Sequence, residues 1–183
     1  MPKNKSILKQ SGVALILLIV YLIVAIPFKV MSVIPGFTDI RPVTLLEPVY
    51  GIFFGVYGCI AFAIGNLIGD ILSGSLRWSS IAGFILCFSG PFAYWFFWNK
   101  ISKTSFCLRT GKDLLKQLCV TIITAIVLSI LLSCVVELSY PEVKVSVFAI
   151  TVLLNETVFP VFLGIPLIIL MQEELNFKPK TFI

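Results

Sequence analysis

Residues 36–77 have the sequence GFTDIRPVTLLEPVYGIFFGVYGCIAFAIGNLIGDILSGSLR, and the predicted fold is organised around this stretch. It begins with a polar segment, TDIRP (residues 38–42), and approaches its end with a second one, GNLIGD (residues 65–70). A long apolar run that contains the glycines Gly55 and Gly58 separates the two. Charged and amide side chains beside such a run are rare in membrane proteins, and those that occur are usually functional.

The composition of the whole chain predicts an integral membrane protein. Of its 183 residues, 58% are hydrophobic and only 13% are charged, and the mean hydropathy is +1.05. A soluble domain of this length cannot bury so much apolar surface. The first apolar segment lacks a small-residue cleavage site and is long enough to span, so we do not expect a signal peptide. We expect one all-α domain over residues 1–183.

The apolar pattern predicts six transmembrane helices. Residues 49–76 would extend about 42 Å as a single helix, which is too long for one ordinary span and short for two. The glycines Gly55 and Gly58 offer a turn within this region, so we divide it there. The expected helices cover residues 11–28, 43–55, 58–75, 80–98, 114–136 and 145–171.

The distribution of positive charge supports this division and predicts the topology. With six helices and a cytoplasmic N-terminus, ten of the fourteen basic residues lie in the cytoplasmic segments. If residues 49–76 formed one span, the basic loop at 100–116 and the N-terminus would lie on opposite sides, against the positive-inside rule. We therefore expect both termini in the cytoplasm.

Polar residues at the outer end of the predicted bundle are the candidate binding site. In a helix, Asn66 and Asp70 lie four residues apart on one face. Asp39 and Arg41 either form a structural clasp, paired with each other or with Glu47, or close over a bound polar molecule. The predicted substrate-binding residues are Asp39, Arg41, Asn66, Asp70, Trp78, Asn155 and Glu156, with Trp78 as a stacking surface.

Small residues predict close helix packing. Ala61, Gly65, Gly69 and Ser73 recur every four residues, and such stripes let two helices approach closely in lipid. The stripe packs either against a helix of a partner protein or within the bundle itself; the pattern does not decide between these two interpretations.

Several classes of function are disfavoured. The chain has no histidine, which removes the commonest general base and metal ligand. No P-loop pattern occurs, and the five cysteines are scattered without a CxxC motif. The positive charge follows the predicted topology, so we expect no nucleic-acid partner. We expect neither a metal nor another cofactor, and no enzymatic activity.

With these features in order, the chain resembles the substrate-binding S component of energy-coupling factor (ECF) vitamin transporters, which are ABC importers of bacteria and archaea. The resemblance rests on residues 38–42, 49–55 and 65–70, and on the last span at 154–159 and 163–166. It implies a six-helix subunit that binds a vitamin or related micronutrient from outside, under the connection that follows the first helix.

The resemblance also implies partners, namely a transmembrane coupling subunit, two cytoplasmic ATPase subunits and the surrounding membrane lipid. Many members contact the coupling subunit through an Ala-xxx-Ala pattern on the first helix. This chain has Gly12 and Ala14 there but no such pattern, so Ala61, Gly65 and Gly69 are the alternative docking residues. Two other hypotheses stay open: a scaffolding subunit without a small ligand, and a lipid-modifying enzyme that depends on Asp70 or Glu156.

Overall fold

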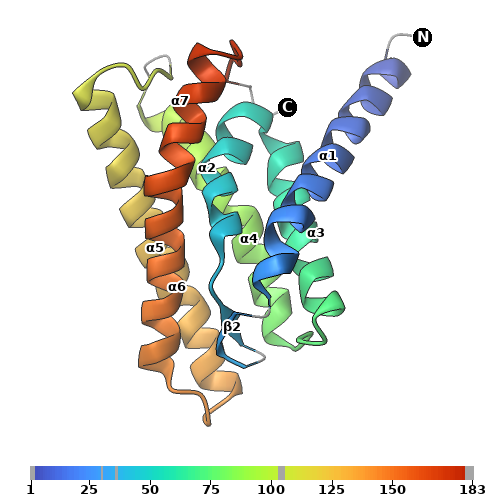
Figure 1. Cartoon of the computed structure of the whole chain (residues 1–183), viewed down its shortest axis with the longest axis vertical. Coiled ribbons are helices and arrows are strands. Elements are labelled where there is room, and N and C mark those ends of the chain that lie inside the picture. The colour runs from blue at the N-terminus through green and yellow to red at the C-terminus, as the bar shows by residue number, and fades with distance from the viewer. Residues whose placement is uncertain (1–2, 30, 36, 103–105, 180–183) are drawn as a thin grey trace.

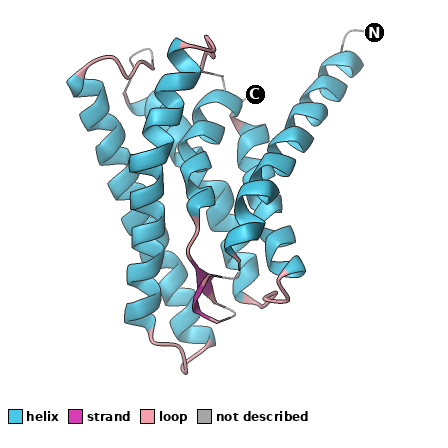
Figure 2. Ribbon diagram, in the orientation of Figure 1, coloured by secondary structure: helices cyan, strands magenta, loops and turns pink. Residues whose placement is uncertain are grey.

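The computed structural model describes residues 3–29, 31–35, 37–102 and 106–179. In this part the chain is helical apart from one short hairpin (Figure 2). The long helices are α1 (Lys3–Ala25), α3 (Val56–Leu72), α4 (Ser79–Phe96), α5 (Gly111–Ser139) and α6 (Val145–Phe159). The shorter elements are η1 (Ile26–Phe28), β1 (Ser32–Ile34), β2 (Thr38–Asp39), η2 (Pro42–Leu45), α2 (Leu46–Val49), η3 (Tyr50–Phe54), η4 (Phe97–Ile101), η5 (Pro160–Gly164) and α7 (Ile165–Glu173).

Four helical segments in the described part of the chain are long and apolar enough to cross a membrane. They are Ser11–Phe28, Ser79–Ile101, Gly111–Ser139 and Val145–Glu173. Their outer faces carry large exposed apolar side chains, among them Ile23 on α1 and Ile130 on α5. Such faces suit hydrocarbon better than water. The structure thus agrees with the sequence on an all-helical fold with membrane-spanning helices.

The chain turns at Gly55, inside the region that the sequence analysis divided. Two shorter apolar helices, Pro42–Phe54 and Val56–Leu72, lie on either side of the turn. Gly55 has φ 58° and ψ −133°, a backbone conformation that is essentially restricted to glycine. Gly58 allows the first turn of α3 to pack closely against η3, because a methyl group at residue 58 would lie 2.3 Å from the Tyr50 carbonyl oxygen. The predicted turn is therefore confirmed, with boundaries one to three residues away from those expected.

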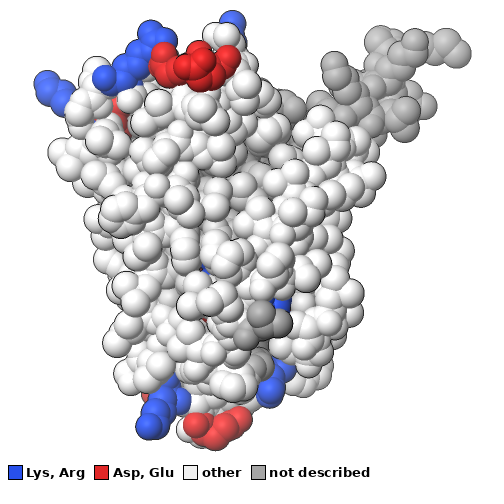
Figure 3. All heavy atoms as spheres, in the orientation of Figure 1, with Lys and Arg blue, Asp and Glu red and all other residues white. Residues whose placement is uncertain are grey.

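Different elements of the fold lie at the two ends of the molecule. In Figure 1 the start of α1, the turn at Gly55 and the end of α7 lie at the upper end, together with both termini. The β1–β2 hairpin, the connection between α3 and α4, and the connection between α5 and α6 lie at the lower end. Charged side chains gather at both ends on the face shown in Figure 3, and a broad uncharged band separates them. This distribution fits a bundle that crosses an apolar layer.

The core packs α3 against α1 and α4, and α5 against α6. The ring of Tyr21 on α1 meets Phe62 on α3 edge-on, with 4.8 Å between the centroids. Gly65 makes room for this contact, because a methyl group at residue 65 would lie 2.4 Å from a ring carbon of Tyr21. Ala61 is buried in the same seam. Of the two interpretations left open for the small-residue stripe, packing within the bundle is the one with an observed contact.

Candidate functional site

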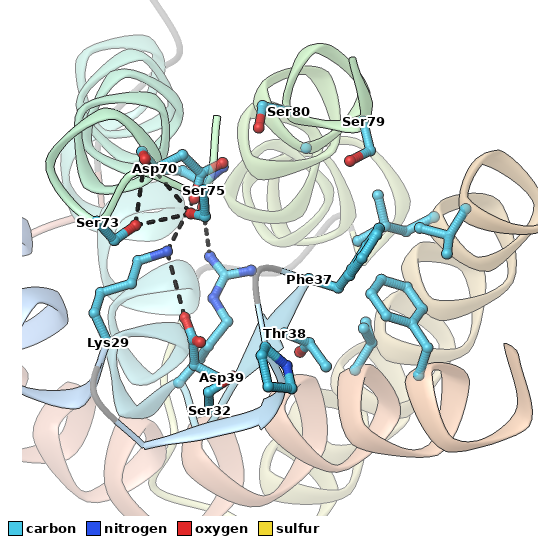
Figure 4. A pocket seen from close by; sticks show the side chains of 18 of the residues that line it. Lys29, Ser32, Phe37, Thr38, Asp39, Asp70, Ser73, Ser75, Ser79 and Ser80 are labelled. Atoms are coloured by element: carbon cyan, nitrogen blue, oxygen red, sulfur yellow. Dashed lines mark hydrogen bonds and ion pairs between the residues drawn. The ribbon is translucent and has the colours of Figure 1, made fainter. Parts of the chain in front are cut away.

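A polar pocket of about 230 Å³ lies at the end of the bundle that carries the β1–β2 hairpin, and residues of the hairpin form part of its lining (Figure 4). The two strands of the hairpin pair antiparallel, with Ser32 opposite Asp39. Side chains from the end of α1, the hairpin, α3, α4, α5 and α6 surround the pocket. Its polar lining consists of Lys29, Ser32, Thr38, Asp39, Arg41, Asn66, Asp70, Ser73, Ser75, Ser79 and Ser80, and its apolar side includes Phe37, Leu132, Val136, Phe148 and Val152.

Arg41 lies at the inner end of this pocket and is held by residues of three helices. Its Nη2 donates a hydrogen bond of 2.8 Å to Oδ1 of Asn66 and a longer one of 3.4 Å to the hydroxyl of Tyr21. Nη2 also lies 3.8 Å from the sulfur of Cys87. These contacts fix the guanidinium on the wall formed by α1, α3 and α4. The remaining N–H groups of this planar guanidinium can donate hydrogen bonds to an acceptor atom of a ligand.

Asn155 attaches the segment that carries Asp39 and Arg41 to α6. Its Oδ1 accepts a hydrogen bond of 3.0 Å from the backbone N–H of Arg41. Its Nδ2 donates one of 2.8 Å to the backbone carbonyl of Asp39. The hydroxyl of Thr44 donates to the backbone carbonyl of Asn155 at 2.6 Å. Asn155 thus positions the binding segment from behind rather than facing the pocket, although the sequence analysis placed it among the ligand contacts.

Lys29 bridges two acidic residues of the pocket. Its Nζ lies 2.9 Å from Oδ1 of Asp70 and 3.4 Å from Oδ2 of Asp39, and all three side chains are mostly buried. Asp39 therefore pairs with Lys29, and the structure does not form the clasp of Asp39 with Arg41 or Glu47 that was one of the two alternatives. The segment after η1 brings Lys29 between the two carboxylates instead, as Figure 4 shows. The lysine ties α1, β2 and α3 together at the pocket.

A pair of carboxyl groups lies inward of Arg41. Glu47 on α2 and Glu156 on α6 are only 2% and 6% exposed. Both line a small cavity of about 20 Å³ that Arg41 also lines. Gly90 on α4 makes room for Glu47, because a methyl group at residue 90 would lie 2.7 Å from both of its carboxyl oxygens. Glu156 therefore belongs to this inner group rather than to the pocket itself.

Trp78 does not take part in the pocket. Its side chain is 81% exposed, in the connection between α3 and α4. Phe37 and Phe148 supply the aromatic surface of the lining instead. Phe37 is held by the guanidinium of Arg77, which lies 4.3 Å from the centroid of its ring, and by an edge-on contact of 4.9 Å with Tyr140.

The proposed docking residues divide into two groups. Ala61 and Gly65 are buried against α1, and Gly69 lies beside Lys29. Gly12 is exposed on α1 and Ala14 is half-buried. Apart from its chain neighbours and the backbone of its own helix, a methyl group placed at Gly12 has no heavy atom of the described residues within 4 Å. Only the α1 pair thus retains a surface that a partner helix can reach.

Several lining residues were not anticipated from the sequence. Lys29 directly follows the first span, a place where basic residues commonly anchor helices, so its role as a bridge had no separate indication. Ser73, Ser75, Ser79 and Ser80 surround the junction of α3 and α4. The clustering of these serines between two predicted spans could have indicated their place in the pocket. Hydroxyl groups beside a polar helix end offer further hydrogen-bond donors and acceptors to a ligand.

The site has several kinds of polar group that can recognise a ligand. It offers cationic, anionic, hydroxyl and amide groups around a volume that fits a small organic molecule. Among the described residues, no three acidic or cysteine side chains converge as the ligands of a metal ion.

The sequence matches no model of a known protein family and no curated protein, and the structure matches no solved structure.

Proposed function

We propose that this chain is the substrate-binding membrane subunit of an ATP-driven importer of the ECF type. The observation that carries the proposal is the polar pocket beneath the hairpin. The two polar ends of the stretch 36–77 meet there: Asp39 and Arg41 come from the first end, and Asn66 and Asp70 from the second. A polar pocket at one end of an apolar bundle is an arrangement suited to capturing a small nutrient from outside.

The chemistry of the lining indicates the kind of ligand. Arg41 provides a planar fork of donors, whereas the serine hydroxyls donate and accept. Phe37 and Phe148 add aromatic surface on which a flat ring can stack. The ligand is thus a small polar molecule with a heterocyclic ring, in the size range of a vitamin or nucleobase.

The proposal includes the six-span topology with both termini in the cytoplasm. In support, the termini lie at one end of the molecule and the pocket at the other (Figure 1). The basic residues expected inside exceed those expected outside, as the positive-inside rule requires. The pocket then faces the exterior of a bacterial or archaeal plasma membrane. Labelling of single cysteines introduced at Ser75 and at Ser102, in a variant without the native cysteines, tests the two sides.

Transport by this subunit requires partners, because the sequence has no P-loop to bind ATP. We assign the energy-supplying step to two cytoplasmic ATPase subunits and a transmembrane coupling subunit. The exposed part of α1 around Gly12 and Ala14 is the proposed contact with the coupling subunit. Purification from the native membrane should recover these subunits together with the chain.

Native mass spectrometry of the purified protein tests the function directly. The wild-type chain should carry a metabolite that Arg41→Ala and Asp70→Ala lose while remaining folded in detergent. Trp78→Ala is the matched control, because Trp78 is exposed outside the pocket, and it should retain the metabolite. Retention in both pocket variants would reject the site. A wild-type chain that carries no metabolite and recovers no ATPase would favour a scaffolding role.

A further inference from the structure

The carboxyl pair of Glu47 and Glu156 is a feature that the proposed binding function does not use. The two side chains come from α2 and α6 and meet inside the bundle, 2% and 6% exposed. They line the same small cavity as Arg41, and the Oε2 atom of each has no hydrogen-bond partner among the described residues. Two buried acids with unsatisfied oxygens indicate a site for a small positive species.

The placement of the two acids around one small cavity defines that species. Two full negative charges so close together in an apolar interior repel strongly, which favours the protonation of one of them. A protonated carboxyl group can donate a hydrogen bond to a neighbouring carboxylate, whereas two ionised carboxylates can only accept. The pair therefore resembles other carboxyl pairs in which one proton is held between two acids.

Among the described residues around the pair, Arg41 carries the positive charge that can balance it. Arg41 interacts electrostatically with both carboxyl groups. The other titratable groups that face the pair are the hydroxyl of Tyr94 and the thiols of Cys59 and Cys87. Hydroxyl and thiol groups of this kind are neutral near neutral pH. One positive charge on Arg41 is therefore available to balance the pair.

We propose that Glu47 and Glu156 form a proton-binding site inward of the pocket. The pair holds one shared proton at neutral pH, and the guanidinium of Arg41 balances the single negative charge that remains. The group of three is then electrically neutral, as burial in a membrane bundle requires. Arg41 also lines the pocket, so it connects this proton site to the place where a ligand is proposed to bind.

Infrared spectroscopy of the purified protein detects such a proton without knowledge of any ligand. Wild-type protein at neutral pH should show the C=O stretching band of a protonated carboxylic acid, shifted when water is replaced by D₂O. In Glu47→Gln or Glu156→Gln the band should disappear, because the remaining carboxylate balances Arg41 by itself. Glu142→Gln, in an exposed turn, is the control and should leave the band unchanged.

Thermal unfolding of the same variants tests the charge balance. Each single glutamine variant should unfold near the wild-type midpoint, because one carboxylate still faces Arg41. The double variant removes both, so its midpoint should fall by more than the sum of the single changes. The proposal is overturned by a wild-type spectrum without the carboxylic acid band, by a band that survives both single variants, or by additive changes in the midpoint.

Discussion

The side-chain oxygen of Asn66 accepts a 2.8 Å hydrogen bond from the guanidinium of Arg41, and so joins the two polar ends of the stretch 36–77. This contact depends on the turn at Gly55, which returns α3 toward the hairpin. Without the turn, the two residues would lie at opposite ends of a long helix. The pocket thus follows from one change of direction in the backbone.

Asn66→Ala should lower the free energy of unfolding by about 1.5–3 kcal/mol, the range for hydrogen bonds to charged groups. The change leaves the buried part of the Arg41 guanidinium without its best acceptor, and thermal unfolding in detergent measures the effect. Asn99→Ala is the control, because Asn99 is exposed and its side chain donates to the backbone carbonyl of Trp95 in its own helical segment. Equal midpoints for the two variants would contradict the importance of the contact.

Asn155→Ala should loosen the segment from Asp39 to Arg41. Both hydrogen bonds between the Asn155 side chain and that backbone are lost, and unsatisfied buried groups cost about 1–3 kcal/mol each. Hydrogen exchange followed by mass spectrometry should show faster exchange in the peptide that covers residues 37–45. Exchange in the α5 peptide should not change, and an unchanged rate at 37–45 would argue against an anchoring role for Asn155.

Lys29→Gln should destabilise the protein by about 1–3 kcal/mol, because Asp39 and Asp70 lose their shared partner while they remain mostly buried. Adding Asp70→Asn should recover part of this loss, because it removes one of the unpaired charges. A double-mutant cycle based on thermal unfolding measures the coupling between the two positions. If the two changes simply add, the ion pair has no coupling of its own and the prediction is wrong.

Gly55→Ala should destabilise the protein by about 1–3 kcal/mol, because φ 58° and ψ −133° impose strain on any residue with a Cβ atom. Gly12→Ala is the control, because Gly12 lies in α1 where a methyl group meets nothing within 4 Å. The two variants can be compared by the midpoint of thermal unfolding. A midpoint for Gly55→Ala at or above that of Gly12→Ala would show that the turn tolerates a side chain.

The sequence predicted the helices well because hydrophobic runs and glycines mark them directly. The turn at Gly55 and the convergence of residues 38–41 with Asn66 and Asp70 followed from length and charge. Asn155 was predicted as a ligand contact, because polar groups inside a span are usually functional, but in the structure it binds the backbone of Asp39 and Arg41. Its specific partners were not predictable, since they are backbone atoms brought to it by the fold.

The parts that were missed depend on side-chain direction and on the path of the connections. Glu47 lies in the expected helix at 43–55 but was not among the predicted site residues, whereas the structure buries its side chain beside the cavity that Arg41 and Glu156 also line. Lys29 was indistinguishable from an anchoring lysine at the end of a span. Trp78 was chosen because it lies next to the second polar segment, but its side chain points into solvent or headgroups instead of the pocket.

The contacts of Asn155 separate the shape of the pocket from its selectivity. Asn155 holds the N–H of Arg41 and the carbonyl of Asp39, and every amino acid except proline offers both of these groups. These two contacts with Asn155 therefore do not depend on which side chains the segment displays. The side chains of Asp39 and Arg41 add their own contacts, to Lys29 and Asn66. A change of selectivity can leave the asparagine anchor in place, but it has to replace these side-chain contacts.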